Sequence, residues 1–567
     1  MRFEILERDG LARNGRIEID GVVHDTPCIA FIDTERFPAP EDTFRLRSME
    51  RAGKGELAIA ESAFANEHAE GHLKPGHRGS PYTKNDEPSD LAILQGTSEK
   101  LLDSKKFADA ISILKDGPEL IRPLYCSVMG LPNRLAFLSY CGFDIFDSLP
   151  IIMASENGTY FTSTGKLDYS KIQSLPCSCP ACLSGVRGKN ELLRHNYAVA
   201  RDELKFVKHA ISMGIMRELV ESRVRSDPWL VQNLRLLDIE HQDLQELHAS
   251  VRGSPFHAGS KESLTRPDIV RWRTRLGQRY KKPESASILL LIPCSAKKPY
   301  SMSQSHMRFR QAIWASGRAG LVHEVIVTSP LGLVPRDLEL FYPAQDYDIP
   351  VTGHWDMDEK KMAEDLVSWL ISSQKYDLVI SHLGDEREPV NSVLKDFIDT
   401  SSGNPGSRES LRRLEEELKA GPAAKDVSRK VRELDDMRAL CRFQFGPAGE
   451  SLCEGARVVG RWPSLKMFKG DSQLGMLTGD RGMISLTIEG GKALAKDGAY
   501  SVEIDDFKPK GNLFAVGVER ASPEIRIGDD VAVVHSGDVR AVGVAQMTPL
   551  EMNLAERGEA VHIRHAI

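Results

Sequence analysis

The sequence has no apolar run near the roughly 18 residues that a membrane-spanning helix needs. Its start, Met1-Arg2-Phe3-Glu4, lacks the pattern of a secretory signal peptide. We therefore expect a cytoplasmic protein with no membrane partner. The formal net charge is -7, so the chain has no excess of cations for indiscriminate binding to polyanions. Any surface for nucleic acid must be local.

Two short motifs are also missing. There is no Gly-x-x-x-x-Gly-Lys-Ser/Thr loop, so activation by ATP is not expected. There is no Cys-x-x-x-Cys-x-x-Cys pattern, so radical chemistry on an iron-sulfur cluster is not expected either. Cysteine itself is sparse, and nine is an odd number with three clustered. This usage fits reduced thiols and a metal site better than a disulfide framework.

The most reactive stretch of the chain is 293–306. It places a thiol, two amines, a phenol, several hydroxyls and an imidazole directly after the apolar run Ile288 to Ile292. The run predicts a buried parallel strand, and a helix is expected to begin near Ser303. The cluster would then lie at the carboxyl end of a strand, where open α/β sheets bind ligands. The alternative is an ordinary turn with a capping serine and a solvated lysine pair.

The spacing of this stretch resembles the motif of the archaeosine synthases. Pro293-Cys294, Lys298-Pro299-Tyr300, Ser303 and His306 match that motif without a gap, and the resemblance continues through 328–339 and 347–355. It implies an enzyme that adds the side-chain amine of free L-lysine to the nitrile of 7-cyano-7-deazaguanine at position fifteen of archaeal tRNA. The product is an amidine-linked adduct on the path to archaeosine. A separate radical enzyme would then perform the final cleavage.

The motif can supply the groups that this addition needs. Only about one lysine amine in 10³ is neutral at pH 7, so a proton acceptor is required, and His306 is the candidate. Tyr300 and Lys298 could donate toward the nitrile nitrogen, and Ser303 could orient His306 or cap the next helix. Cys294 could attack the nitrile first and form a thioimide, or be a small buried residue.

The binding site for the amino acid stays open at this stage. Arg336 could pair with its carboxylate. Its ammonium group could meet any of several carboxylates, none singled out by spacing: Asp346, Asp348, Asp356, Asp358, Glu359, Asp337 and Asp385.

The first 165 residues alternate short apolar runs, such as Arg16 to Val23 and Cys28 to Ile32, with turn signals, which predicts strands of a mixed α/β domain. Segment 131–148 resembles the late barrel of tRNA-guanine transglycosylases, with Asp147 at the position of their nucleophile. A full β/α barrel needs about 200 residues or more, yet 176 precede Cys177, so the barrel must be truncated. That family's second catalytic aspartate segment is absent, which counts against base exchange. Asp147 could instead be a structural residue, a substrate contact or a turn aspartate.

A candidate metal site follows. Cys177, Cys179 and Cys182 supply thiolates suited to tetrahedral zinc, and His195 can complete the set, with His209 as the substitute. Four protein ligands make a closed, structural site. The alternative is a set of unligated core thiols.

Two segments are candidates for contact with RNA. Segment 266–282 holds seven cations with interleaved Trp272 and Tyr280, and its candidate contacts are Arg271, Arg273 and Arg275. A solvated basic helix face is the alternative there. From 499 onward, short strands punctuated by Gly and Asp predict a small β-barrel that resembles a PUA domain, with Lys508, Lys510 and Arg526 as candidate contacts.

The expected architecture is a multidomain α/β chain. Its expected parts are a truncated transglycosylase-like β/α domain (1–165), a zinc module with a long helix (166–225), a basic connector (226–285), a three-layer α/β catalytic domain (286–400), a charged helical linker (401–430), a small α/β module (431–498) and the PUA-like barrel (499–567). The competing functions are base exchange by a tRNA-guanine transglycosylase and a non-catalytic tRNA-binding subunit. The oligomeric state, including a homo-oligomer, stays open.

Overall fold

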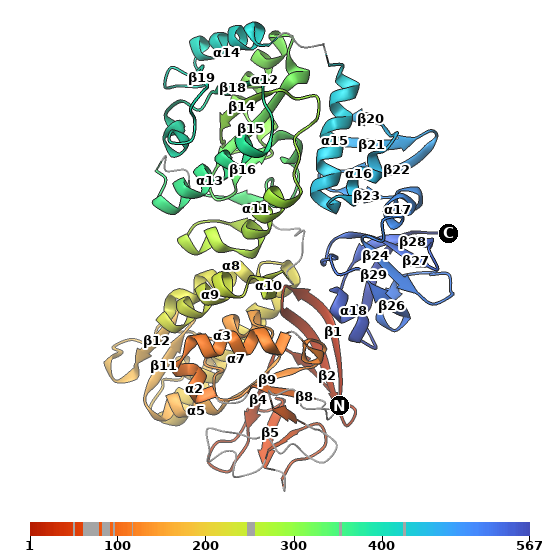
Figure 1. Cartoon of the computed structure of the whole chain (residues 1–567). Helices are drawn as coiled ribbons and strands as arrows, with labels where there is room; N and C mark the ends of the chain where they lie inside the picture. Colours follow the sequence, from red (N-terminus) through yellow and green to blue (C-terminus); the bar gives the residue numbers. More distant parts are fainter. Residues whose placement is uncertain are drawn as a thin grey trace. The chain divides into compact units, whose positions relative to one another are not determined.

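The computed structural model describes residues 1–48, 51–59, 79–81, 91–94, 97–115, 117–246, 256–350, 354–422 and 427–567. The chain divides into two compact units (Figure 1). Unit 1 comprises residues 1–249 with 554–558, and unit 2 comprises residues 250–553 with 559–567. Within the described ranges, no helix combines the length and the apolar character that crossing a bilayer demands.

Unit 1 is built around a parallel sheet with the strand order β6-β5-β4-β10-β9-β8-β7. Among the described residues, β6 and β7 form the two edges of this sheet and do not pair with each other. Its strands are β4 (Cys28–Ile32), β5 (Arg45–Ser48), β6 (Leu57–Ile59), β7 (Gly79–Pro81), β8 (Leu91–Leu94), β9 (Leu124–Cys126) and β10 (Ile145–Asp147). The helices among them are α2 (Thr97–Leu102), α3 (Ser104–Lys115), α4 (Leu135–Tyr140) and α5 (Leu149–Glu156).

An antiparallel meander precedes this sheet, formed by β1 (Arg2–Asp9), β2 (Ala12–Ile19) and β3 (Val22–Thr26). The predicted strand from Arg16 to Val23 is therefore wrong as a single element. Asp20 and Gly21 adopt φ angles of 50° and 81°, which reverse the chain between β2 and β3. Aspartate followed by glycine is a pair that tight hairpin turns favour, because both positions need a positive φ.

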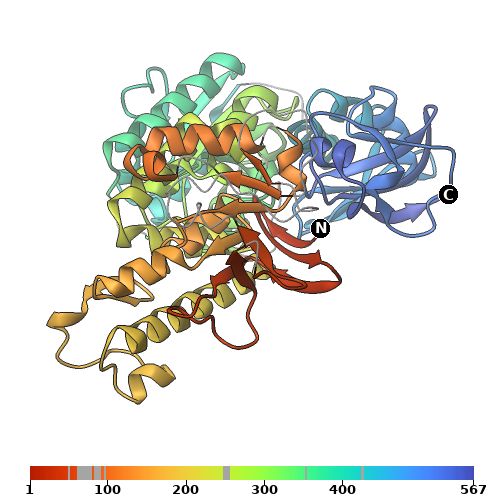
Figure 2. The same ribbon diagram turned by 90° about the horizontal axis from the view of Figure 1, so that it is seen from below.

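The rest of unit 1 is a β-hairpin and a set of helices. The hairpin is β11 (Thr159–Thr162) with β12 (Gly165–Asp168), and the helices are α6 (Pro180–Leu183), α7 (Lys189–Met213), α8 (Met216–Arg223), α9 (Pro228–Glu240) and α10 (Gln242–Gln245). Figure 2 shows the long α7 running beside α5, against which it packs.

Unit 2 contains a five-stranded sheet with the order β16-β15-β14-β18-β19. Its strands are β14 (Ile288–Pro293), β15 (Val322–Thr328), β16 (Gly332–Pro335), β18 (Leu378–Ser381) and β19 (Ile398–Asp399). Only β16 is antiparallel to its neighbour, as expected for a mainly parallel sheet. The surrounding helices are α11 (Pro267–Arg279), α12 (Gln304–Ala315), α13 (Met357–Ser373) and α14 (Arg408–Ala420), and a short parallel pair joins β13 (Phe256–His257) to β17 (Tyr347–Asp348).

The connections reverse direction at β14. From β14 the chain passes through α12 to β15 on one side, and it later reaches β18 on the other side. This topological switch point lies at the carboxyl end of β14, which is where open α/β sheets form ligand crevices.

The remaining chain forms two smaller parts of unit 2. The first has α15 (Arg429–Phe445), α16 (Ala448–Cys453), α17 (Ile488–Ala495) and an antiparallel sheet of β20 (Arg457–Arg461), β21 (Ser464–Lys469), β22 (Ser472–Leu477) and β23 (Ile484–Leu486). The second has α18 (Pro549–Leu554) and a six-stranded sheet of β24 (Ser501–Ile504), β25 (Leu513–Phe514), β26 (Val518–Ala521), β27 (Asp530–His535), β28 (Asp538–Ala545) and β29 (Glu559–Ala566).

The charged stretch expected to be a solvated linker is instead partly buried. Helix α14 packs against α12, and its residues Leu414 and Leu418 are fully buried. Leucines at i and i+4 make one apolar stripe, which the surrounding charges conceal in the sequence.

Candidate active-site pocket

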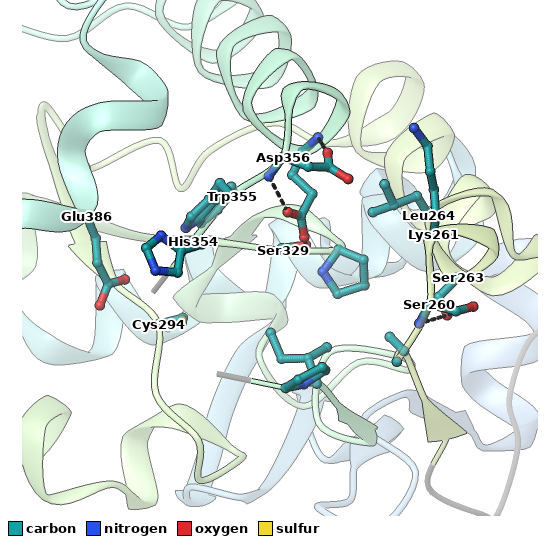
Figure 3. Close-up of a pocket in the computed structure, with 16 residues that line it drawn as sticks. Ser260, Lys261, Ser263, Leu264, Cys294, Ser329, His354, Trp355, Asp356 and Glu386 are labelled. Carbon is teal, nitrogen blue, oxygen red and sulfur yellow. Dashed lines mark hydrogen bonds between the residues drawn. The ribbon is translucent and has the colours of Figure 1, made fainter. Parts of the chain in front are cut away.

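A pocket of about 280 Å³ lies at the switch point. Three of its side chains directly or closely follow adjacent parallel strands: Cys294 after β14, Ser329 after β15 and Glu386 after β18. Figure 3 shows Cys294 and Glu386 on one side of the pocket, with Ser260 and Lys261 on the other. The fold thus gathers a thiol, a carboxylate and a hydroxyl from distant segments at one sheet edge.

Cys294 and Glu386 modify each other's acidity. Burial, with the Glu386 carboxylate nearby, raises the pKa of the Cys294 thiol to about 11, while the Thr328 hydroxyl and Lys298 oppose this rise. Partial desolvation also raises the pKa of the Glu386 carboxyl, against a hydrogen bond from the Cys294 amide. The Cys294 thiol is therefore protonated at neutral pH, and the carboxylate of Glu386 beside it is more basic than that of an ordinary glutamate.

Lys298 and Tyr300 lie on an aromatic, hydroxyl-rich support. The Lys298 ammonium is 3.9 Å from the centre of the Tyr347 ring, and partial burial lowers its pKa. Tyr300 is fully buried, and its hydroxyl contacts the Tyr347 hydroxyl, which lies 2.7 Å from Thr328 Oγ1. A chain of hydroxyls thus runs from Tyr300 through Tyr347 to Thr328, whose hydroxyl acts on the Cys294 thiol.

His306 does not have the geometry of the predicted proton acceptor. Its Nε2 donates to the Pro293 carbonyl at 3.0 Å, and its Nδ1 accepts from Arg336 Nη2 at 2.7 Å, so both ring nitrogens are occupied. Burial, together with the Arg336 charge, lowers the pKa of His306 to about 2. The imidazole is a neutral, fully buried connection between β14 and Arg336.

Ser303 is the N-cap of α12, which confirms that the helix starts where the sequence predicts. Its hydroxyl accepts a hydrogen bond from the His306 amide at 3.3 Å. Such a cap satisfies an otherwise unpaired helix amide.

The structure shows which of the candidate residues for binding the amino acid are engaged elsewhere and which line the pocket. Arg336 is half-buried and its guanidinium pairs with Glu324 and Glu339, so it is not available for a free carboxylate. Asp337 is buried against Tyr280, and burial raises the pKa of Asp346 to about 7.

Of the predicted carboxylates, Asp356 and Glu359 line the pocket. Asp358 pairs with Lys261 at 2.6 Å, whereas Asp348 and Asp385 are exposed and lie outside the pocket lining. Residues 351–353 of the second resemblance segment fall outside the described residues.

The cysteine cluster is assembled in unit 1. The ligand atoms of Cys177, Cys179, Cys182 and His195 all lie within 4.8 Å of one another. The Nδ1 atom of His195 is 3.4 and 3.3 Å from the sulfurs of Cys179 and Cys182, and Nε2 donates to the Phe161 carbonyl at 2.8 Å. This leaves the Nδ1 lone pair directed at the thiols, as a metal ligand requires. The substitute ligand, His209, is not in the cluster.

Asp147 is held in a way that does not suit a nucleophile. Its carboxylate is buried at the end of β10 and accepts hydrogen bonds from the Tyr125 hydroxyl and from the amides of Val128 and Leu149. The Val128 amide belongs to a residue with a φ of 62°, which a branched side chain rarely adopts. Asp147 therefore stabilises a strained turn.

The three candidate RNA contacts of the basic segment 266–282 lie mostly inside the protein. Arg271, Trp272 and Arg275 are buried in α11, and Arg273 donates to the Leu264 carbonyl at 2.6 Å. The Trp272 indole donates to the Leu333 carbonyl at 3.0 Å. Arg279, at the end of the helix, donates to Gln444 and Tyr500 in later parts of unit 2. The cations of this segment join parts of the protein.

The candidate contacts of the C-terminal barrel differ in accessibility. Lys508 and Lys510 are exposed. Arg526 is half-buried, and its guanidinium donates to the carbonyls of Pro523 and Ile525. The two lysines are thus freer to meet a ligand.

Sequence reasoning missed Glu386, Thr328 and Tyr347. Thr328 and Tyr347 lie inside the segments that carry the family resemblance, so that signal was present. Glu386 follows the apolar run of β18, and the rule that ligand sites collect at strand ends could have indicated it.

Comparisons with known proteins identify related segments in both units of the chain. Three family models match: "Queuine tRNA-ribosyltransferase" over residues 90–228, "Domain of unknown function (DUF5591)" over 269–418 and "PUA domain" over 495–567. The archaeosine synthase subunit alpha of Methanosarcina acetivorans is 35% identical over 99% of both chains, and the archaeosine synthase of Haloferax volcanii is 31% identical over 99% of both chains. The tRNA-guanine(15) transglycosylase of Methanobrevibacter smithii is 24% identical over 83% of this chain and 71% of its own. Full-length similarity at this level shows that the chain belongs to the archaeosine synthase family.

Proposed function

We propose that this protein adds the side-chain amine of free lysine to the nitrile of 7-cyano-7-deazaguanine in tRNA. The observation that carries the proposal is the pocket at the switch point, where Cys294 and Glu386 face each other beside further polar groups. Family membership supports a tRNA-modifying transferase, and the PUA and transglycosylase-like regions are parts that such an enzyme would use to hold tRNA.

Glu386 is the proton acceptor in this proposal, in place of His306. The incoming amine is almost entirely an ammonium ion at pH 7, and it must lose a proton before it attacks carbon. The raised pKa of Glu386 makes its carboxylate a better base, and its position beside Cys294 puts it at the reacting end of the pocket. General bases of this kind contribute about 10² to 10⁴ in rate.

The nitrile nitrogen must gain a proton as the amine attacks. Lys298 is the proposed donor, because its pKa is lowered by burial and its ammonium is held near Cys294 on the Tyr347 ring. Overall, one carbon-nitrogen bond forms and the nitrile becomes an amidine. The proton lost by the amine and the proton gained by the nitrile balance, so no redox partner or nucleotide is needed.

The other end of the pocket suits the charged groups of a free amino acid. Lys261 lies opposite Cys294, with Asp356 between them (Figure 3). Asp356 is the N-cap of α13, and Glu359 in the first turn of that helix also lines the pocket. In the proposed pose the lysine side chain spans the pocket. Its carboxylate replaces Asp358 in the exposed ion pair with Lys261, and its α-ammonium lies near the two acids.

Cys294 has two possible roles that one substitution separates. In a covalent route, Glu386 accepts the thiol proton, the sulfur forms a thioimide with the nitrile, and the lysine amine then displaces the sulfur. In a direct route, Cys294 only shapes the pocket. Cys294→Ala abolishes lysine addition in the first case and retains substantial activity in the second.

The cysteine cluster is proposed to hold a structural zinc ion. Cys177, Cys179, Cys182 and His195 fit a closed tetrahedral set, and such an ion would cross-link the loop before α6 to α7. With four protein ligands it has no position for substrate, so it takes no part in the chemistry.

The test of the function is incubation of the purified full-length protein with labelled lysine and nitrile-bearing tRNA. Lysine addition transfers label to the tRNA, whereas base exchange leaves no lysine label and a pure binding subunit leaves no product. Cleavage of the adduct is proposed to need a separate radical enzyme, so the lysine adduct should accumulate.

A further inference from the structure

Helix α12 carries an unusual surface next to the pocket. Between Glu284 and Glu324 the chain has no acidic residue, although acids outnumber bases overall. Five cations lie in this interval: Lys297, Lys298, Arg308, Arg310 and Arg318. The local charge therefore has the opposite sign to that of the whole protein.

The buried face of α12 packs against the sheet, which explains why the helix forms. This packing does not account for the residues on the exposed face. His306, Phe309 and Ile313 are buried against the sheet at helical spacing. The opposite stripe exposes Met307 and Trp314, which are 45% and 64% exposed. The Arg310 guanidinium lies 5.2 Å from the centre of the Trp314 ring, and Arg308 is exposed beside it.

Three of these cations differ from those of the neighbouring helices in having no carboxylate partner within the part of the chain that the structure describes. Lys297, Arg308 and Arg310 have no ion pair with any described residue. On α14, which packs against α12 (Figure 1), Arg412 and Lys419 pair with Glu416 and Glu415. On α13, Lys361 pairs with Asp365. A surface evolved only for solubility would show the same mixed charges on α12.

The position of α12 links this surface to the pocket. A helix that follows a parallel strand runs back along it, so the first turn of α12 lies near the carboxyl end of β14, where Cys294 is. Lys297 is therefore near the pocket, and Trp314 lies roughly 15 Å from the start of α12 along the helix axis.

We infer that the outward face of α12, defined as Met307, Arg308, Arg310 and Trp314 together with Lys297 in the preceding loop, binds the RNA strand that flanks the modified nucleotide. This inference rests on the proposed function for the identity of the RNA. Unpaired cations meet phosphates, and an exposed tryptophan with an arginine beside it offers a stacking platform for an unpaired base. The face guides the strand so that its nitrile enters the pocket.

Two full-length variants test the inference, with fluorescence anisotropy of a tRNA transcript at several salt concentrations as the readout. Arg308→Gln with Arg310→Gln should reduce the slope of log Kd against log salt by about 1.4, because two phosphate contacts are lost. Trp314→Ala should raise Kd about tenfold with little change in slope. The matched control is Arg412→Gln with Lys419→Gln on α14, which removes the same charge and should leave both quantities unchanged.

The turnover assay separates this inference from the proposed function. At saturating nitrile-bearing tRNA the α12 variants should incorporate lysine at the wild-type rate, with a raised KM for tRNA. If the wild type adds no lysine while the variants still bind RNA weakly, the function fails and the surface stands. Wild-type Kd and salt slope in both variants overturn the inference, and loss of self-association in sedimentation would then assign the face to a second copy of the chain.

Discussion

At the residue scale, the active-site motif separates into Cys294, which lines the pocket, Lys298, which lies beside Cys294 on the Tyr347 ring, and several side chains that hold the loop. Cys294 lines the pocket, whereas Tyr300, Ser303 and His306 are buried. Arg336 connects the buried group, because it donates to His306 and pairs with Glu339, whose carboxylate also accepts from the Ser301 amide at 2.8 Å. The loop after β14 is thus fixed at both ends by buried polar contacts.

Glu386→Gln should lower kcat/KM for lysine addition by about 10² to 10⁴, since the amide cannot accept the proton of the amine. In the wild type, the carboxylate must be ionised to act. Activity should therefore fall with decreasing pH through the raised pKa of Glu386, at a higher pH than for an ordinary glutamate. Rates of label transfer across a pH series measure both effects. The matched control is Glu388→Gln, which alters a nearby exposed carboxylate paired with Lys360. Wild-type activity in Glu386→Gln would refute its role.

Arg336→Met should destabilise unit 2 by about 3 to 5 kcal/mol, because Glu324 and Glu339 would keep their charges in a buried site without a partner. Urea denaturation followed by tryptophan fluorescence measures the change. Arg412→Met on the exposed face of α14 breaks a solvated pair and should cost less than about 1 kcal/mol. Equal stability of the two variants would show that the Arg336 network is not a stabilising feature.

At the element scale, α11 and α12 differ in whether their cations are available to a ligand, and the number of cations does not predict which helix has them available. Helix α11 has many cations, yet Arg271 and Arg275 point inward and its tryptophan is buried. Helix α12 has fewer cations, Arg308 and Arg310, and neither has a carboxylate partner among the residues that the structure describes. The residue types were read correctly from the sequence, and only the exposure of each stripe distinguishes a structural arginine from one available to a ligand.

Removing one thiol from the cysteine cluster should release the proposed zinc. Cys182→Ser is expected to reduce bound zinc from about one ion per chain to near zero, and to lower the melting temperature of unit 1. Atomic emission spectrometry and calorimetry provide the two readouts. Cys28→Ser, which changes a cysteine outside the cluster, should keep its zinc. A wild-type protein purified without zinc and insensitive to chelators would contradict the assignment.

At the scale of the whole molecule, buried ion pairs join successive parts of the chain. In unit 2, Asp530 of the C-terminal sheet accepts hydrogen bonds from Arg481 at 2.7 Å and from the Leu486 amide at 2.9 Å, and it also pairs with Arg564. Asp530 is fully buried, so this carboxylate connects the C-terminal sheet with the preceding small sheet.

Asp530→Ala should therefore loosen this junction. The expected loss is about 2 to 3 kcal/mol, below the full value for a buried pair because both arginines reach solvent. Hydrogen exchange of β27 and β28 gives the local free energy of opening. Asp538→Ala, at the exposed first residue of β28, is the control and should exchange like the wild type. Unchanged protection in Asp530→Ala would show that the junction is held by packing alone.

The sequence by itself determined the local features: the strand that ends at Pro293, the helix capped by Ser303, the clustered thiols and the family motif. These depend on periodicity and spacing within a few residues. Only the tertiary structure decided which motif residue meets the pocket, that Glu386 lies beside Cys294, and that Arg336 occupies the free nitrogen of His306. Burial, pairing and pKa depend on groups from distant segments, which the fold brings together and which neighbouring residues do not reveal.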